Sequence, residues 1–221
     1  MTSKGFRDGL LRRARSVGLH VPDEVAGRLE AYVTFLGKWN AKINLTALPL
    51  APPTNETFDR LLIEPLLAAQ YAGPVRGPWF DLGSGGGSPA LPMKTVLLET
   101  PLTMVESKVR KAVFLREAVN AMHLLGTHVE NERFEDVASL NPNTAELITV
   151  RAVRVDATLT SVASQLLGAS GRLFLFRPIR RHVPIGGFEH VETIDLVAER
   201  GSCLSVYRPM FHVEHKANGE T

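Results

Sequence analysis

A glycine-rich segment at residues 81–87, Asp-Leu-Gly-Ser-Gly-Gly-Gly, limits the possible folds of this chain more strongly than any other stretch. It directly follows a short apolar run at 79–80 and precedes a stretch with helical composition. Glycine has no Cβ, so the backbone can turn tightly here and approach a bound molecule closely. Glycine-rich turns that lead from a strand into a helix are typical of nucleotide-binding α/β folds, although some have only a structural role.

The spacing of the glycines and acids separates two kinds of nucleotide site. The dinucleotide pattern Gly-x-Gly-x-x-Gly would place a glycine at position 88, where this chain has Ser88. The pattern present, Asp-x-Gly-x-Gly-x-Gly, is that of methyltransferases that use S-adenosylmethionine (SAM). Asp81 at the end of the strand suits a cationic cofactor better than a pyrophosphate, which it would repel. Glu106 ends the next expected strand, and in either interpretation it would accept hydrogen bonds from the two ribose hydroxyls.

Short apolar runs alternate with helical stretches after residue 78, which predicts an α/β fold with a mainly parallel sheet. The expected strands are 79–81, 103–106, 128–130, 147–151, 172–176, 191–196 and 203–207. The expected helices between them are 91–99, 108–125, 133–140 and 155–167. The last two strands could instead form an antiparallel hairpin.

The first third of the chain has a different pattern. Apolar residues recur every three or four positions over residues 23–40, which predicts an amphipathic helix, and a second helix is expected over 58–71. Glycine and proline at 73–78 then mark a boundary. We therefore expect a helical extension at 1–72 and a nucleotide-binding domain at 73–221, packed as one compact unit.

Composition excludes several classes of protein. With 221 residues, 44% of them hydrophobic and 22% charged, the chain can bury a core, and no apolar run is long enough to cross a bilayer. A single cysteine, Cys203, cannot form an internal disulfide. His212 and His215 lie in a polar tail without an evident third ligand, so we expect no metal site. A cytoplasmic monomer without a membrane partner is expected.

The net charge of +2 conceals two basic clusters, at residues 1–20 and 151–181. Arginine predominates in both, and its planar guanidinium binds phosphate in a bidentate manner. These clusters favour an RNA partner, although solvated surface arginines or a compositional bias of the genome would give the same pattern. The predicted RNA-binding residues are Arg12, Arg13, Arg15, Arg180 and Arg181.

Several segments, in order along most of the chain, resemble the bacterial ribosomal RNA small subunit methyltransferase G family, also called glucose-inhibited division protein B. One segment is Lys-Trp-Asn-Ala-Lys-Ile-Asn-Leu-Thr at 38–46, and another is Phe-Asp-Leu-Gly-Ser-Gly-Gly-Gly-Ser-Pro-Ala-Leu-Pro at 80–92. The remaining similar segments are 105–115, 133–135, 150–153 and 210–215. Together they are far more specific than the glycine motif alone.

This resemblance implies a Rossmann-like methyltransferase sheet with N-terminal helices beside it. It also implies methyl transfer from SAM to N7 of a guanine in 16S rRNA, with the free RNA or the 30S small ribosomal subunit as partner. The cofactor contacts that it implies are Gly83, Ser88, Phe134, Glu135 and Arg151. We add Asp81 and Gly85 to this cofactor-binding set from the glycine motif, and Glu106 from the general geometry of methyltransferases. Arg151 is also the predicted catalytic residue, with a strand-end ion pair as its alternative role.

The chain departs from the family pattern in three places. Where the family usually has Arg-His-x-x-Asp-Ser-Leu, this chain has Arg-Leu-Leu-Ile-Glu-Pro-Leu at 60–66, so Leu61 replaces the histidine and Glu64-Pro65 replaces Asp-Ser. A typical Lys-Gly after the fifth strand is replaced by Arg177-Pro178. The glycine loop continues with Ser88 and Ala90, where larger residues or glycine are common. The first two departures lie where RNA contacts are expected, so they concern the target base more than the cofactor.

Guanine N7 has an in-plane lone pair and needs no deprotonation, which agrees with the lack of a convincing general base in the sequence. Two alternatives remain open at this stage. One is a catalytically silent RNA-binding member of the fold. The other is a nicotinamide-dependent oxidoreductase, which the missing glycine at position 88 disfavours.

Overall fold

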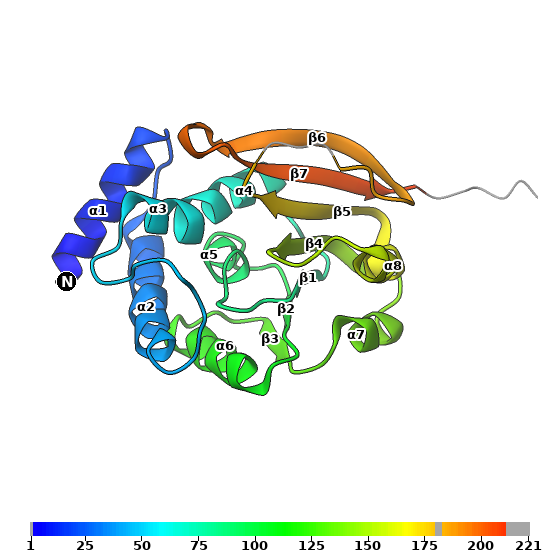
Figure 1. The fold of residues 1–221 in the computed structure, drawn as a ribbon, viewed down its shortest axis with the longest axis horizontal. Helices are drawn as coiled ribbons and strands as arrows, with labels where there is room; N and C mark the ends of the chain where they lie inside the picture. The colour runs from blue at the N-terminus through cyan, green and yellow to red at the C-terminus, as the bar shows by residue number, and fades with distance from the viewer. Residues whose placement is uncertain (1, 180–182, 211–221) are drawn as a thin grey trace, which may run out of the picture.

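The structure is a computed structural model, and it describes residues 2–179 and 183–210. Its centre is a seven-stranded sheet with the strand order β3-β2-β1-β4-β5-β7-β6 (Figure 1). The strands are β1 (Trp79–Leu82), β2 (Leu102–Val105), β3 (Thr127–Glu130), β4 (Ala145–Arg151), β5 (Leu167–Arg177), β6 (Phe188–Val197) and β7 (Ser202–Pro209). Strands β1 to β5 are parallel, and β7 pairs antiparallel with both β5 and β6. The predicted α/β sheet is thus confirmed, with the final strands as a hairpin.

Helices cover both faces of the sheet (Figure 1). On one face lie α5 (Ala90–Lys94) and α6 (Val109–Ala121), and on the other lie α7 (Phe134–Leu140) and α8 (Ala157–Leu166). Side chains of a strand alternate between the faces, so neighbouring residues of β1 enter different cores. Trp79 joins the core on the α5–α6 side, whereas Phe80 and Leu82 join the core on the α7–α8 side.

The N-terminal region forms α1 (Ser3–Ser16), α2 (Asp23–Asn40), α3 (Asn55–Phe58), a π-helical turn η1 (Asp59–Ile63) and α4 (Glu64–Ala72). A short 3-10 turn, η2 (Ala198–Arg200), connects β6 to β7. No element was expected over α1, because its basic residues obscure an apolar stripe of Phe6, Leu10 and Ala14 that the structure buries.

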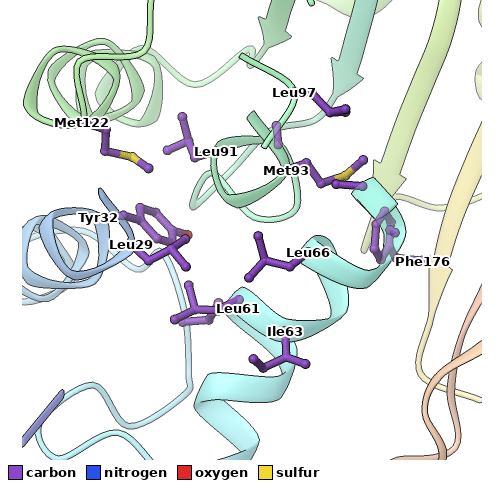
Figure 2. Close-up of a cluster of buried hydrophobic side chains, with 14 of the residues drawn as sticks. Leu29, Tyr32, Leu61, Ile63, Leu66, Leu91, Met93, Leu97, Met122 and Phe176 are labelled. Carbon is purple, nitrogen blue, oxygen red and sulfur yellow. The ribbon is translucent and has the colours of Figure 1, made fainter. Parts of the chain in front are cut away.

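The N-terminal helices share one hydrophobic core with the sheet. Figure 2 shows Leu29 and Tyr32 of α2 lying near Leu61 of η1, Leu66 of α4 and Leu91 of α5. All five side chains are buried. The extension therefore packs over the α5–α6 face of the sheet and lies beside the glycine-rich turn.

The described residues were also compared with what a membrane-spanning helix and a metal site require. Within residues 2–179 and 183–210, no helix is long and apolar enough to cross a membrane. The same part of the chain holds no group of three or more His, Cys, Asp or Glu side chains that could bind a metal ion. Arg180, Arg181, His212 and His215 lie outside the described residues.

The prediction that Arg13 contacts RNA is corrected by its surroundings. Arg13 is buried, and its Nε and Nη2 atoms donate to the two carboxylate oxygens of Asp59, at 2.6 and 3.0 Å. Arg200 of η2 donates to the same carboxylate, and Asp59 is fully buried. A guanidinium held in this way is not accessible to a phosphate. Arg13 instead fixes α1 to η1 through Asp59, and to the β6–β7 turn through Glu199, whose carboxylate lies 3.2 Å from its Nη2.

We predict that Asp59→Asn lowers the free energy of unfolding by about 3–5 kcal/mol, because it leaves two arginines without their buried counter-ion. Urea denaturation followed by circular dichroism measures this change. The matched control is Glu24→Gln, which breaks the exposed pair with Arg28 on α2 and should cost less than about 1 kcal/mol. Equal effects of the two substitutions would show that the buried network does not stabilise the fold.

Candidate active site

The glycine-rich turn connects β1 to α5 and has the backbone conformation that its glycines permit. Gly83 and Gly85 have φ angles of +76° and +51°, in the left-handed region that favours glycine. A Cβ on Gly83 would lie 2.6 Å from Cγ2 of Val153, so the chain after β4 packs directly against the turn. A Cβ on Gly85 would contact only a backbone oxygen at 3.7 Å. The space beside Gly85 is therefore open to a ligand.

Glu106 stands at the end of β2 and holds this turn in place. Its Oε2 accepts the backbone N–H of Gly85 at 2.9 Å, and its Oε1 accepts that of Lys108 at 2.8 Å. A carboxylate offers about four lone-pair positions, so two remain for further donors. Glu106 thus joins the β1–α5 turn to the β2–α6 loop and still offers acceptors for the hydroxyls of a ribose.

A cavity of about 320 Å³, here called the glycine-loop cavity, opens beside this turn. Five residues predicted from the sequence line it together: Gly83, Gly85, Ser88, Glu106 and Arg151. The remaining wall comes largely from the N-terminal region and α6, through Tyr32, Leu36, Leu45, Thr46, Leu48, Arg60, Leu61 and Lys111. Arg60 and Leu61 belong to the segment 60–66, where the sequence analysis expected RNA contacts. It did not predict the other six as site residues, although the resemblance at 38–46 could have directed attention to Leu45 and Thr46.

Arg151, the last residue of β4, is fixed by several contacts. Its guanidinium pairs with the buried carboxylate of Glu64 and also donates to the carbonyl of Arg60. It donates to Oγ of Ser88 at 3.2 Å and lies 4.6 Å from the ring centre of Phe176. Burial lowers the pKa of Arg151, and the charge of Glu64 opposes that shift. The predicted strand-end ion pair is present, and the side chain lines the cavity as well.

Asp81 lies behind the turn and does not line the cavity. Its Oδ1 accepts the hydroxyl of Thr149 at 2.6 Å, and that hydroxyl oxygen accepts the indole N–H of Trp79 at 2.9 Å. Its Oδ2 is buried and has no hydrogen-bond partner among the described residues. Burial raises the pKa of Asp81 to about 6. A buried carboxylate oxygen without a donor is the arrangement that a nearby cationic group would stabilise.

Besides Asp81 and Arg13, four further predicted residues lie away from the glycine-loop cavity. Phe134 and Glu135 begin α7, and neither is among the lining residues. Arg12 and Arg15 are exposed on α1 and do not line the cavity either. Their roles in cofactor and RNA binding stay predictions.

These features fit SAM, which combines a ribose, a carboxylate and a cationic sulfonium. Glu106 would accept hydrogen bonds from the ribose, and the open side of Gly85 would let the backbone approach the cofactor. The negative charge of Asp81 favours the sulfonium, and the guanidinium N–H groups of Arg151 would donate hydrogen bonds to the SAM carboxylate. Because Glu64 neutralises Arg151, the arginine does not repel the sulfonium.

We predict that SAM binding tightens as pH rises through about 6, by up to about tenfold per pH unit. Asp81 attracts a cation only when ionised, so the bound cofactor lowers its pKa. Without SAM, folded Asp81 holds its proton more tightly than the unfolded chain does. The free energy of unfolding therefore falls as pH rises from about 4 to 6. Calorimetric titration of SAM over this range measures the effect. Asp81→Asn should abolish the dependence, and an unchanged dependence in that variant would contradict the prediction.

Comparison with known proteins gives a consistent result. Residues 26–199 match the family model described as rRNA small subunit methyltransferase G. The chain is 30% identical over 168 residues to "Ribosomal RNA small subunit methyltransferase G" of Geotalea uraniireducens (strain Rf4), covering 76% of this chain and 75% of that protein. It is 33% identical over 162 residues to the protein of the same name from Xanthomonas oryzae pv. oryzae (strain KACC10331 / KXO85), covering 72% of each.

A solved structure has the same fold. A SAM-dependent methyltransferase from Aquifex aeolicus superposes with a TM-score of 0.53 at 14% identity, covering 66% of this chain and 89% of that one. At this identity the likeness supports a shared Rossmann-like sheet and nothing finer. The sequence matches go further: the chain belongs to the rRNA small subunit methyltransferase G family and is a SAM-dependent methyltransferase.

Proposed function

We propose that the protein methylates N7 of a guanine in 16S rRNA, either free or within the 30S subunit, with SAM as methyl donor, and that it acts as a monomer. One observation carries this proposal. The glycine turn, the Glu106 carboxylate and the Arg151 guanidinium line a single cavity at the carboxyl ends of β1, β2 and β4. Ligands in open α/β sheets bind at this edge, where the strand order reverses. The names of the relatives supply the class of RNA.

The chemistry requires little of the protein beyond alignment. Bound SAM supplies a methyl group on a sulfonium sulfur, and the N7 lone pair attacks that carbon while the carbon–sulfur electron pair stays on sulfur. No side chain has to accept a proton. Tyr32 lines the cavity but does not serve as a proton acceptor. Burial raises its pKa, and its hydroxyl donates to the carbonyl of Gly86 at 2.6 Å. Tyr32 thus stays neutral and supports the glycine turn.

The main catalytic contribution of the chain is therefore to align guanine N7 with the methyl carbon and the sulfur of SAM. Correct orientation alone is worth up to about 7–11 kcal/mol of the barrier. We assign Arg151 to orienting the reactants. Its four contacts fix the guanidinium, so little conformational entropy is lost when it binds a reactant. Ser88 assists, because its Oγ accepts from Arg151 and donates to the carbonyl of Leu61 at 3.0 Å.

The test uses 30S subunits from cells that lack this protein, together with SAM labelled in the methyl group. We expect the wild-type protein to label 16S rRNA, at a position that borohydride and aniline cleavage identify as N7-methylguanine. Gly85→Ala should lower SAM affinity more than about tenfold, because its new methyl group enters the cavity. Gly18→Ala is the matched control, since Gly18 also has a positive φ and open space beside it but does not line the glycine-loop cavity.

The outcomes separate the alternatives. SAM binding without label transfer would support a silent RNA-binding protein, and label at another atom would exclude N7. Equal SAM affinity in Gly85→Ala and Gly18→Ala would remove the glycine turn from the cofactor site. Binding of NADH in place of SAM would support the oxidoreductase.

A further inference from the structure

Three buried side chains form a chain of hydrogen bonds next to the glycine-rich turn. Trp79 and Asp81 are alternate residues of β1, so their side chains lie on the same face of the sheet. Thr149 pairs with Asp81 in the parallel register of β1 and β4, which are neighbours in the sheet (Figure 1). None of the three is more than 1% exposed. The strand geometry therefore brings these side chains together inside the core.

The hydrogen bonds in this chain have a fixed direction. An indole N–H can only donate, and that of Trp79 donates to Oγ1 of Thr149 at 2.9 Å. The Thr149 hydroxyl has a single hydrogen, which it donates to Oδ1 of Asp81 at 2.6 Å. A hydrogen bond donated to a carboxylate stabilises its ionised form. Trp79 and Thr149 together therefore favour the negative charge of Asp81.

Asp81 needs this support because its surroundings oppose its charge. Burial raises the pKa of Asp81 to about 6, and the hydrogen bond from Thr149 is the strongest of the influences that lower that pKa. Two charged groups nearby act in opposite directions, since Arg151 lowers the pKa of Asp81 and Glu106 raises it. Tyr32 adds no charge, because burial raises its own pKa. Without the Thr149 hydroxyl, the balance would move towards a protonated Asp81.

A purely structural role would not require the hydroxyl of Thr149. Leu147, the nearest residue on the same face of β4, is buried and apolar. Valine has the same branched shape as threonine and would fill this position without a polar atom that needs a partner. The hydroxyl is therefore explained by the carboxylate to which it donates.

We propose that Thr149, oriented by Trp79, is a positioning residue that keeps Asp81 ionised and leaves its second oxygen available to the sulfonium of SAM. This inference deepens the proposed function and rests on it for the bound cofactor. Thr149 occupies Oδ1, whereas Oδ2 is buried and has no hydrogen-bond partner among the described residues. A buried anionic oxygen in that state is unstable unless a cation compensates it, and the cofactor supplies one.

The test replaces Thr149 by valine and measures SAM affinity by calorimetric titration between about pH 5 and 9. Thr149→Val should raise the midpoint of the pH dependence by about one to two pH units, because the hydrogen bond to the carboxylate is lost. SAM affinity should then fall about two- to tenfold at pH 7, and the loss should disappear towards pH 9, where Asp81 is ionised in both proteins. Thr149→Ser keeps the hydroxyl and should restore the wild-type midpoint.

Two further variants separate this role from a general loss of packing. Thr95→Val is the matched control, because Thr95 is equally buried and its hydroxyl donates to the carbonyl of Pro92 at 2.6 Å instead of to a carboxylate. It should leave the midpoint unchanged. Trp79→Phe removes the indole donor and keeps the Thr149 hydroxyl, so it should raise the midpoint by less than Thr149→Val does.

Trp79 also reports the ionisation of Asp81 without cofactor. The chain has two tryptophans, so Trp39→Phe leaves Trp79 as the only indole. Its emission should change with a midpoint near pH 6, as Asp81 loses its proton. Thr149→Val in this background should raise the midpoint by as much as in the SAM titration, and Asp81→Asn should abolish the transition.

The proposal is overturned if Thr149→Val keeps the wild-type midpoint, or if it loses SAM affinity equally at every pH. An equal shift in Thr95→Val would also overturn it. If Thr149→Val does not fold, Trp79→Phe decides, and an unchanged midpoint in that variant contradicts the proposal. A wild-type protein that binds SAM but transfers no methyl group contradicts the proposed function, and both titrations still decide on Thr149 because neither needs methyl transfer.

Discussion

The buried guanidinium of Arg151 is the point on which the arrangement of the site depends. A cation removed from water is unstable unless charge and hydrogen bonds compensate it. Here the compensation comes from Glu64, the carbonyl of Arg60 and Oγ of Ser88. Two of these three partners belong to the N-terminal region, so the ion pair fixes that region on the end of β4. The glycine-loop cavity exists because the N-terminal helices are fixed there.

The π-helical turn makes this contact possible. Turns of this kind are rare and occur frequently at functional sites. In η1 the carbonyls of Arg60 and Leu61 accept hydrogen bonds from Arg151 and Ser88. The first residue of the same turn, Asp59, binds Arg13 and Arg200. One irregular segment therefore connects the outer helices to the reaction site.

The sequence predicted the parts of the structure that depend on local patterns. The glycine turn, the seven strands and the position of Glu106 beside that turn follow from periodicity, spacing and family resemblance. The partners of Arg13 and Arg151 could not be predicted, because they lie 46 and 87 positions away and only folding brings them together. The helix expected over 91–99 ends at Lys94, whose buried ammonium donates to the carbonyls of Leu98 and Thr100. The helix ends at Lys94 because of these tertiary contacts, and no local sequence signal marks its end.

The central claim is that the ion pair between Glu64 and Arg151 holds the N-terminal helices on the catalytic sheet. A double-mutant cycle with Glu64→Gln and Arg151→Gln, followed by urea denaturation, tests it most directly. Each single variant leaves one buried charge unpaired, whereas the double variant leaves none. The account predicts a coupling free energy of about 2–3 kcal/mol, with the double variant hardly less stable than either single one. Additive effects, within about 0.5 kcal/mol, would contradict it.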